Sequence, residues 1–195
     1  MKRTILLLIL LLLAAAPLSA QSKPAKGHFF AGYAFTRVDA EGKLDSEFNI
    51  PDMGNLNMNG FNVAFGVNVG NSSVTDDFSI TFDIGGYFDR LDSIDADNTY
   101  LRLWTLTVGP QFTSRRHEML HPFVRALVGL SYLDTKLDGA KENDLGFAFI
   151  GGGGLDIQMG EVAAWRVLQV DYLLARHASE NLSSFRFATG IAFNF

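Results

Sequence analysis

The sequence contains no cysteine, and beyond its first twenty residues it has no long apolar run. Without cysteine, an exported fold cannot rely on disulfides. A helix that spans a bilayer needs about 20 consecutive apolar residues, and no stretch after residue 20 approaches that length. If the rest of the chain crosses a membrane, it must therefore cross as β-strands.

Basic residues are also scarce. The chain has 16 Lys and Arg against 21 Asp and Glu, a formal net charge of −5, and loss of the N-terminal leader with Lys2 and Arg3 lowers this to −7. Nucleic-acid-binding domains are usually basic, so we expect no nucleic-acid partner. His117 and His121 lack the spacing of metal ligands, and we expect no metal site and no cofactor.

The first twenty residues have the organisation of a secretory signal peptide. Two basic residues precede an aliphatic run over residues 5–13, and small residues follow up to Ala20. This pattern predicts export and cleavage after Ala20. The alternative is an uncleaved anchor, but the aliphatic run is too short to span a bilayer. Residues 21–26 are then a short periplasmic lead-in, and residues 27–195 form one domain.

The rest of the chain repeats one pattern eight times, an alternating segment of 10 to 13 residues followed by a polar spacer. Tilted strands that cross a bilayer have about 9–11 residues, whereas strands of soluble proteins have about five or six. The predicted strands cover residues 27–38, 58–69, 78–90, 100–113, 122–133, 145–158, 165–176 and 184–195.

Within these segments one face is bulky and apolar, and the other is small, polar or charged. A transmembrane barrel turns the bulky face outward and a soluble barrel turns it inward. Alternation alone does not distinguish them, but the leader and the strand length favour the membrane. The sequence predicts an all-β, eight-stranded antiparallel up-and-down transmembrane β-barrel with a polar, side-chain-filled lumen.

Spacer lengths indicate the orientation of this barrel. The spacers after the second, fourth and sixth predicted strands are compact, and the spacer over residues 39–57 is the longest. Spacers after the third, fifth and seventh strands are polar and acidic. Short turns belong to the periplasmic side, so we expect periplasmic termini and acidic extracellular loops.

The C-terminal stretch FRFATGIAFNF, from Phe185 to Phe195, resembles the closing strand of bacterial outer-membrane barrels. With the preceding Val170-Asp-Tyr172, the chain resembles the small OmpA/OmpX-type "outer membrane protein beta-barrel domain" family. This resemblance implies an outer-membrane location and recognition of the closing strand by the barrel-assembly machinery. The residues that would carry the assembly signal are Phe185, Phe187, Ile191, Phe193 and Phe195.

Alternation also predicts a set of inward-facing polar residues. An eight-stranded barrel has an interior just wide enough for side chains, and buried charges need partners. We therefore expect Arg125 and Arg186 to pair with acids among Asp83, Asp156 and Asp171, and to plug the lumen. A narrow passive channel is the alternative. The predicted lumen network comprises Asp83, Asp89, Arg125, Asp156, Gln169, Asp171 and Arg186.

Four arginines fall in the outward register near the extracellular ends of their strands: Arg37, Arg90, Arg102 and Arg176. Guanidinium groups suit bidentate contacts with phosphate, so these residues are candidates for binding lipopolysaccharide phosphates as an incomplete ring. Ordinary snorkelling of long cationic side chains at the interface is the alternative, and both can hold together.

One motif points to catalysis. His177 and Ser179 share a face in an extended strand, and a His-x-Ser pair near the end of a small barrel resembles lipid A deacylases. Those enzymes take an acid from the last strand, and residues 181–195 contain none. We expect no enzyme activity and interpret the chain as a monomeric structural or surface-interaction barrel that contacts outer-membrane lipid. The rivals are a lipid A hydrolase and an exported soluble barrel that binds a small apolar ligand.

Overall fold

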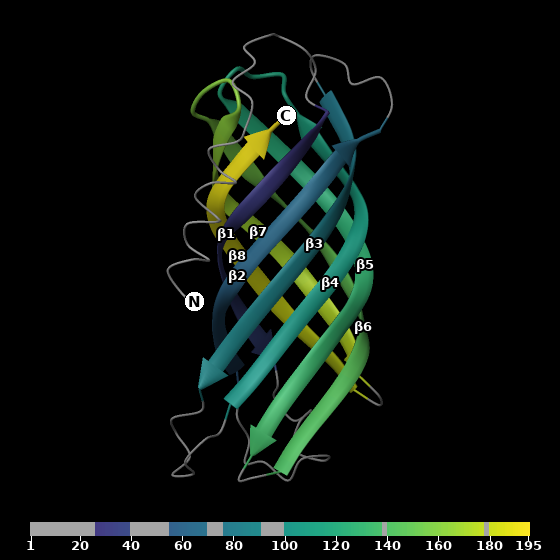
Figure 1. The fold of residues 1–195 in the computed structure, drawn as a ribbon. Coiled ribbons are helices and arrows are strands. Elements are labelled where there is room, and N and C mark those ends of the chain that lie inside the picture. The colour runs from purple at the N-terminus through teal and green to yellow at the C-terminus, as the bar shows by residue number, and fades with distance from the viewer. Residues whose placement is uncertain (1–25, 40–54, 70–75, 91–99, 138–139, 178–179) are drawn as a thin grey trace, which may run out of the picture.

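The computed structural model describes residues 26–39, 55–69, 76–90, 100–137, 140–177 and 180–195. Each strand is antiparallel to its sequence neighbours, and β8 pairs with β1 to close the barrel (Figure 1). No helix among the described residues is long and apolar enough to span a bilayer. The strands are β1 (Gly27–Asp39), β2 (Asn55–Asn68), β3 (Asp76–Arg90), β4 (Tyr100–Ser114), β5 (Leu120–Leu137), β6 (Ala140–Gln158), β7 (Ala163–His177) and β8 (Glu180–Asn194).

The strands are steeply tilted. A row of paired residues that starts at Phe29 runs once around the barrel and returns to β1 at Asp39, ten positions further along. For eight strands this stagger corresponds to a tilt of about 40° from the barrel axis. We call the end that carries Gly27 and Phe195 the terminal end, and the opposite end the distal end.

Bulky apolar side chains cover the outside of the barrel. Phe82 and Leu106 are 51% and 56% exposed, whereas Asp83 and Thr107, one position further along the same strands, are 0% and 2% exposed. A soluble barrel would bury the former and expose the latter. The predicted transmembrane arrangement, with its bulky face outward, is therefore confirmed.

The inside of the barrel changes character along its axis. Polar and charged side chains fill the terminal end and the middle, but Met58, Leu103 and Leu173 are buried in the lumen at the distal end. The expectation of a polar lumen holds only for the first two regions. Where side chains fill the interior completely, an inward position needs volume rather than polarity, so alternation of polarity weakens there.

Strand β7 carries one extra residue relative to both of its neighbours. Leu155 pairs with Leu168, but the next residue, Asp156, pairs with Arg166, and the pairing with β8 shifts in the same place. Such a β-bulge reverses the alternation of faces along its strand. Arg166 and Gln169 are both buried in the lumen although they are three positions apart.

Strands β5 and β6 are the longest, with 18 and 19 residues, and they reach beyond β7 and β8 at the distal end (Figure 1). Only residues 138–139 separate β5 from β6, and only residues 178–179 separate β7 from β8. The expected polar spacers at both places are therefore wrong, because most of their residues continue the strands. Hydrophobic alternation marks only the part of a strand that lies in lipid.

Candidate functional site

Four charged side chains from β3, β5, β7 and β8 meet in the middle of the lumen, and we call them the charge ring: Asp83, Arg125, Asp171 and Arg186. Arg125 donates from Nε and Nη2 to the two Asp171 oxygens at 3.0 and 2.7 Å, and from Nη1 to Asp83 Oδ2 at 3.0 Å. Arg186 donates to Asp171 Oδ2 at 2.8 Å and to Asp83 Oδ1 at 3.0 Å. All four side chains are 0% exposed, and their formal charges cancel.

Neutral polar side chains add further hydrogen bonds to the ring. Asn62 donates to Asp83 Oδ2 at 2.9 Å, and Gln169 donates to Asp171 Oδ2 at 2.8 Å and to Asn62 Oδ1 at 3.1 Å. The Tyr87 hydroxyl accepts from Nη1 of a ring arginine at 3.0 Å. Charge-assisted and bidentate bonds of this kind are the strong ones. The middle of the lumen is thus a rigid, connected network.

A second ion pair lies on the terminal side of the ring. Arg166 donates from Nε and Nη2 to the two Asp156 oxygens at 2.7 and 3.0 Å, and from Nη1 to Gln169 Oε1 at 2.8 Å. Its guanidinium carbon also lies 4.3 Å from the centre of the Phe30 ring and 4.0 Å from that of Phe123. Stacking on these two aromatic rings adds cation–π attraction. The hydrogen bond to Gln169, which itself donates to Asp171, links the pair to the ring.

Two glycines of β6 leave room for these inward side chains. A Cβ on Gly152 would collide with the Asp171 carboxylate, and one on Gly154 would lie 2.7 Å from the Phe123 ring. The glycine run at residues 151–154 therefore lets large lumenal groups approach the β6 backbone.

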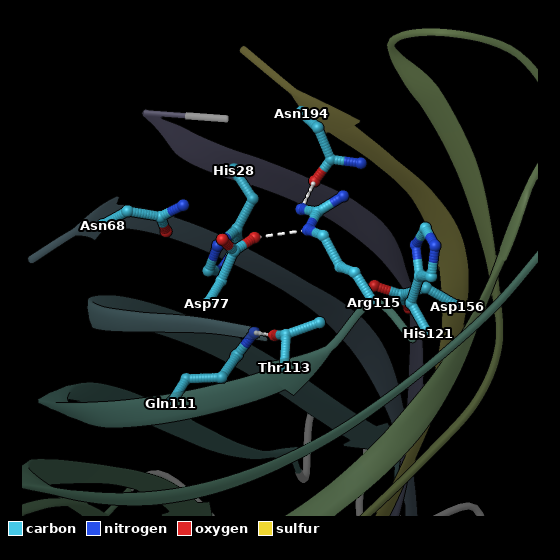
Figure 2. Close-up of a pocket in the computed structure, with 9 residues that line it drawn as sticks. All are labelled: His28, Asn68, Asp77, Gln111, Thr113, Arg115, His121, Asp156 and Asn194. Atoms are coloured by element: carbon cyan, nitrogen blue, oxygen red, sulfur yellow. Dashed lines mark hydrogen bonds and ion pairs between the residues drawn. The ribbon is translucent and has the colours of Figure 1, made fainter. Parts of the chain in front are cut away.

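At the terminal end the lumen contains a polar hollow, which we call the vestibule (Figure 2). Arg115 donates from Nε to Asp77 and from Nη2 to Asn194 Oδ1 at 2.9 Å, which closes one side. The hollow encloses about 10 Å³, room for one water-sized group. Its lining residues are His28, Asn68, Asp77, Gln111, Thr113, Arg115, His121, Asp156 and Asn194.

Two buried atoms in the vestibule have no hydrogen-bond partner among the described residues, His28 Nε2 and Gln111 Oε1. The imidazole of His28 lies flat over Gly66, where a Cβ would stand 2.6 Å from Nε2. In the described ranges, no group of three or more His, Asp and Glu is arranged to hold a metal ion.

On the distal side of the ring the lumen contains an apolar region. A space of about 20 Å³ there is bounded by aliphatic side chains and Ser184, and no polar surface faces it. A cavity of this kind stays dry. We call this region the apolar segment; its lining residues are Val38, Met58, Leu101, Leu103, Leu133, Leu173, Ala175, Leu182 and Ser184.

Most of the lumen residues expected from sequence lie in the charge ring or in the adjacent Asp156–Arg166 pair. Asp156 pairs with Arg166 rather than with Arg125 or Arg186. Asp89 lies six positions beyond Asp83 on the same face of β3 and is half-buried near the distal end.

The alternation argument missed Arg166 because the bulge in β7 reverses its parity. The signal available in the sequence was the spacing of Trp165 and Leu168, two bulky residues that both face outward although they are three positions apart.

The predicted rim arginines follow the outward register. Arg37 and Arg176 are exposed, and Arg102 is 47% exposed with Nη1 3.9 Å from Asp134 Oδ2. Arg90 ends β3, but its side chain is outside the described part. The weak catalytic candidates also fall outside it, since only the backbone of His177 is described and Ser179 is not.

In the closing strand, four of the five expected signal residues are clearly exposed. Phe185, Phe187 and Ile191 are 53%, 39% and 38% exposed, and Phe195 is 49% exposed and stacks on Phe65 with ring centres 5.8 Å apart. Phe193 is half-buried. All of them belong to the lipid-facing register of the barrel.

Comparison with solved structures identifies this architecture. Neisserial surface protein A superimposes with a TM-score of 0.63 and 11% identity over 88% of this chain and 98% of that one. Ail, the attachment invasion locus protein of Yersinia pestis, superimposes with a TM-score of 0.57 and 15% identity over 89% and 100%. The chain has the fold of small bacterial outer-membrane β-barrels. No protein-family model and no curated protein sequence matches it.

A second structure of Ail, in complex with the heparin analogue sucrose octasulfate, superimposes with a TM-score of 0.56 and 16% identity over 87% of this chain and 99% of that one. At this level of identity the likeness concerns the fold. Together with the apolar exterior described above, that fold indicates a membrane-embedded barrel, because bulky apolar side chains around a closed barrel need lipid to cover them.

Proposed function

We propose that this outer-membrane barrel is a structural and surface-interaction protein whose lumen is plugged rather than open. The observation that carries the proposal is the charge ring, whose four side chains are 0% exposed and are joined to one another by five hydrogen bonds. An ion entering the lumen would have to break bonds to buried charges, which is expensive.

The ring is backed by a second barrier of different chemistry. The apolar segment on the distal side of the ring offers no polar surface to a passing ion, and a dry apolar constriction resists the entry of water and ions. Two successive barriers support a plug more strongly than the ring alone, since rearrangement of the charged residues would leave the apolar one in place.

Single-channel recording on the purified protein in planar bilayers tests the plug. We expect no stable, sizeable conductance from the wild type. A variant with Arg125→Ser, Arg186→Ser and Leu103→Ser would weaken both barriers. Conductance of this variant serves as the control that the protein inserts into the bilayer. Stable conductance in the wild type would overturn the proposal in favour of the narrow passive channel.

In this proposal the distal end faces outward and carries the acidic loops, and the rim arginines contact lipopolysaccharide phosphates. Following the strand register, Arg37, Arg90, Arg102 and Arg176 lie within roughly 6 Å of one level along the barrel axis. Arg37 is opposite Asn57 and Phe185, with no acid in the facing positions. Ail binds a polyanionic sugar in its own complex, and similar chemistry on this rim supports the proposal.

Replacing all four rim arginines with Gln should reduce the lipopolysaccharide that co-purifies with the protein. Arg116→Gln is the matched control, because Arg116 is 71% exposed but lies at the terminal end. Equal lipopolysaccharide in the quadruple variant and the wild type would show that the arginines only snorkel. Mass analysis of lipid A from the same cells, with and without expression, tests the rival hydrolase.

The remaining parts of the proposal concern assembly and partners. The outward aromatic residues of β8 would be recognised by the barrel-assembly machinery. The mature protein, a short lead-in over residues 21–26 and the barrel domain over residues 27–195, would be monomeric without a cofactor. Phe195→Ala should slow assembly in cells without reducing the stability of refolded protein to the same extent. Equal assembly rates would contradict the signal role.

A further inference from the structure

The barrel closes where its first strand, β1, pairs with its last strand, β8, and we call this joint the seam. Every other joint connects two strands that follow each other in the chain. The strands of the seam lie at opposite ends of the chain, so bringing them together costs the largest loop-closure entropy. The seam therefore depends on noncovalent contacts more than any other joint does.

The charge ring does not hold the first strand. Its members lie on β3, β5, β7 and β8, so it ties the last strand to the far side of the lumen and leaves β1 out. The inward face of β1 is also small in the middle of the seam, where Gly32 and Ala34 stand opposite Gly190 and Ala188. Glycines in a strand offer no side chain to pack, so little packing joins the two strands there.

One large side chain of β1, Phe30, reaches across the seam. It is fully buried, and the centre of its ring lies 4.3 Å from the guanidinium carbon of Arg166 on β7. Strand β8 lies between them, and in the row that joins Arg166 to Gly32 it carries Gly190, which has no side chain. A Cβ on Gly32 would stand 2.6 Å from the Phe30 ring, so the ring lies back over this row.

Arg166 is held in place by residues on its own side of the seam. Asp156 accepts two hydrogen bonds from it and Gln169 accepts one, and the Phe123 ring lies 4.0 Å from its guanidinium carbon. These three residues belong to β5, β6 and β7. A group that is already oriented loses little entropy when its partner arrives. Strands β5 to β7 thus present a fixed cation to the first strand.

We propose that Arg166 is a positioning residue for barrel closure, which contacts Phe30 when β1 meets β8 and then keeps the seam closed and in register. A shift of β1 by two residues keeps every side chain on its own face, so alternation does not oppose it. Such a shift would move the Phe30 ring by about 7 Å. A cation–π contact needs the cation within about 6 Å of the ring centre, so the shift would break it.

The first test compares Phe30→Leu with Phe123→Leu. Both substitutions remove a buried aromatic ring that contacts Arg166, but only Phe30 lies at the seam. Phe123→Leu is therefore a matched control for the general loss of packing and of cation–π attraction. Amide hydrogen exchange of the whole protein in nanodiscs measures how often each joint opens.

Two amides report on the seam and on the joint between β6 and β7. A Cβ on Gly190 would collide with the carbonyl oxygen of Ala31, so this carbonyl points at β8. A Cβ on Gly152 would collide with the carbonyl oxygen of Val170, which therefore points at β6. In an antiparallel pair the N–H of such a residue points the same way as its C=O. The Ala31 amide reports on the seam, and the Val170 amide reports on the β6–β7 joint.

In Phe30→Leu, the ratio of the Ala31 exchange rate to the Val170 exchange rate should rise about tenfold or more over the wild type. In Phe123→Leu this ratio should stay within about threefold of the wild type, because the seam keeps its contact. An unchanged ratio in Phe30→Leu would show that the contact supports only general stability and would overturn the proposal. Equal rises in the two variants would overturn it as well.

The role of the cation is tested in a background that lacks it. The double variant Asp156→Leu, Arg166→Met removes the cation together with the acid that accepts two of its hydrogen bonds. In this background, Phe30→Leu should change the ratio by less than about twofold, since no cation–π contact remains to be lost. A tenfold rise in the double variant would show that Phe30 acts without Arg166.

Disulfides provide a second test, because the chain contains no cysteine. Ala34 and Ala188 face each other across the seam, Ala148 and Ala175 face each other across the β6–β7 joint, and all four are buried. Both are non-hydrogen-bonded pairs, whose Cα atoms lie close enough for a disulfide. Cysteines at the seam pair should cancel the effect of Phe30→Leu on Ala31 exchange, and cysteines at the other pair should not.

Cancellation by both bridges, or by neither, would overturn the proposal, because the faster exchange would then not arise from opening of the seam. None of these readouts depends on conductance or on lipopolysaccharide. Failure of the closure contact is therefore distinct from failure of the plug or of the rim.

Discussion

The middle of the lumen and its apolar segment lie in the same barrel at nearly the same radius, yet they are filled in opposite ways. The middle holds four charges, each satisfied by at least two partners. The apolar segment holds aliphatic side chains that need only to fill space. A charged interior depends on every member being present, whereas an apolar interior tolerates change in proportion to the volume lost.

This difference predicts unequal sensitivity to mutation. In the middle, removal of one charge leaves its partner buried and unpaired. This lowers the free energy of unfolding by more than the intact pair contributed to it. In the apolar segment, removal of a side chain leaves a cavity that neighbours can partly collapse into.

The largest effect is expected from Asp171→Leu, which deprives Arg125 and Arg186 of a shared carboxylate. We expect a loss of about 3–5 kcal/mol in the free energy of unfolding. Urea unfolding of the refolded protein, followed by the fluorescence of Trp104 and Trp165, measures it.

Replacing the whole ring should be less harmful than breaking it. The variant Asp83→Leu, Arg125→Met, Asp171→Leu and Arg186→Met leaves no unpaired charge among these four positions, so it should lose less than Asp171→Leu alone. A quadruple variant that is less stable than the single one would show that the ring contributes net stability, and the contrast drawn above would be wrong.

The next effect is expected in the apolar segment. Met58 is fully buried there, and Met58→Ala should lower the free energy of unfolding by about 2–4 kcal/mol. Met58→Leu is the control, since it nearly conserves volume and should lose less than about 1.5 kcal/mol. Equal losses for the two variants would show that volume is not what matters in this region.

A smaller effect is expected at the vestibule. Gly66→Ala places a Cβ 2.6 Å from His28 Nε2, so the imidazole must move, at a loss of about 1–3 kcal/mol. The double variant with His28→Ala removes the clash, and its loss should be clearly less than the sum of the single losses. Additive losses in that cycle would contradict the contact.

The smallest effect is expected at the rim. Arg102 is 47% exposed and 3.9 Å from Asp134, so solvent screens the pair. Arg102→Gln should change the free energy of unfolding by less than about 1 kcal/mol. A loss as large as that of Asp171→Leu would remove the distinction between lumenal and rim charges.

Much of the barrel was predictable because alternation is a local property. Strand length and parity placed Phe82 outward and Asp83 inward without knowledge of any partner. The same reasoning failed at Arg166, because one extra residue in β7 reverses parity. In the sequence, this bulge is indicated by the three-residue spacing of Trp165 and Leu168. It also ended β6 at residue 145, because beyond the lipid the strand no longer needs an apolar face.

The sequence by itself determined an eight-stranded transmembrane barrel, and it selected Asp83, Arg125, Asp171 and Arg186 as inward charges. Tertiary structure alone decided that these four meet at one level, that Asp156 turns to Arg166, and that β6 projects past β7. The physical reason is closure: a row of paired residues climbs ten positions around the barrel. The height at which residues from distant strands meet therefore depends on all eight registers together.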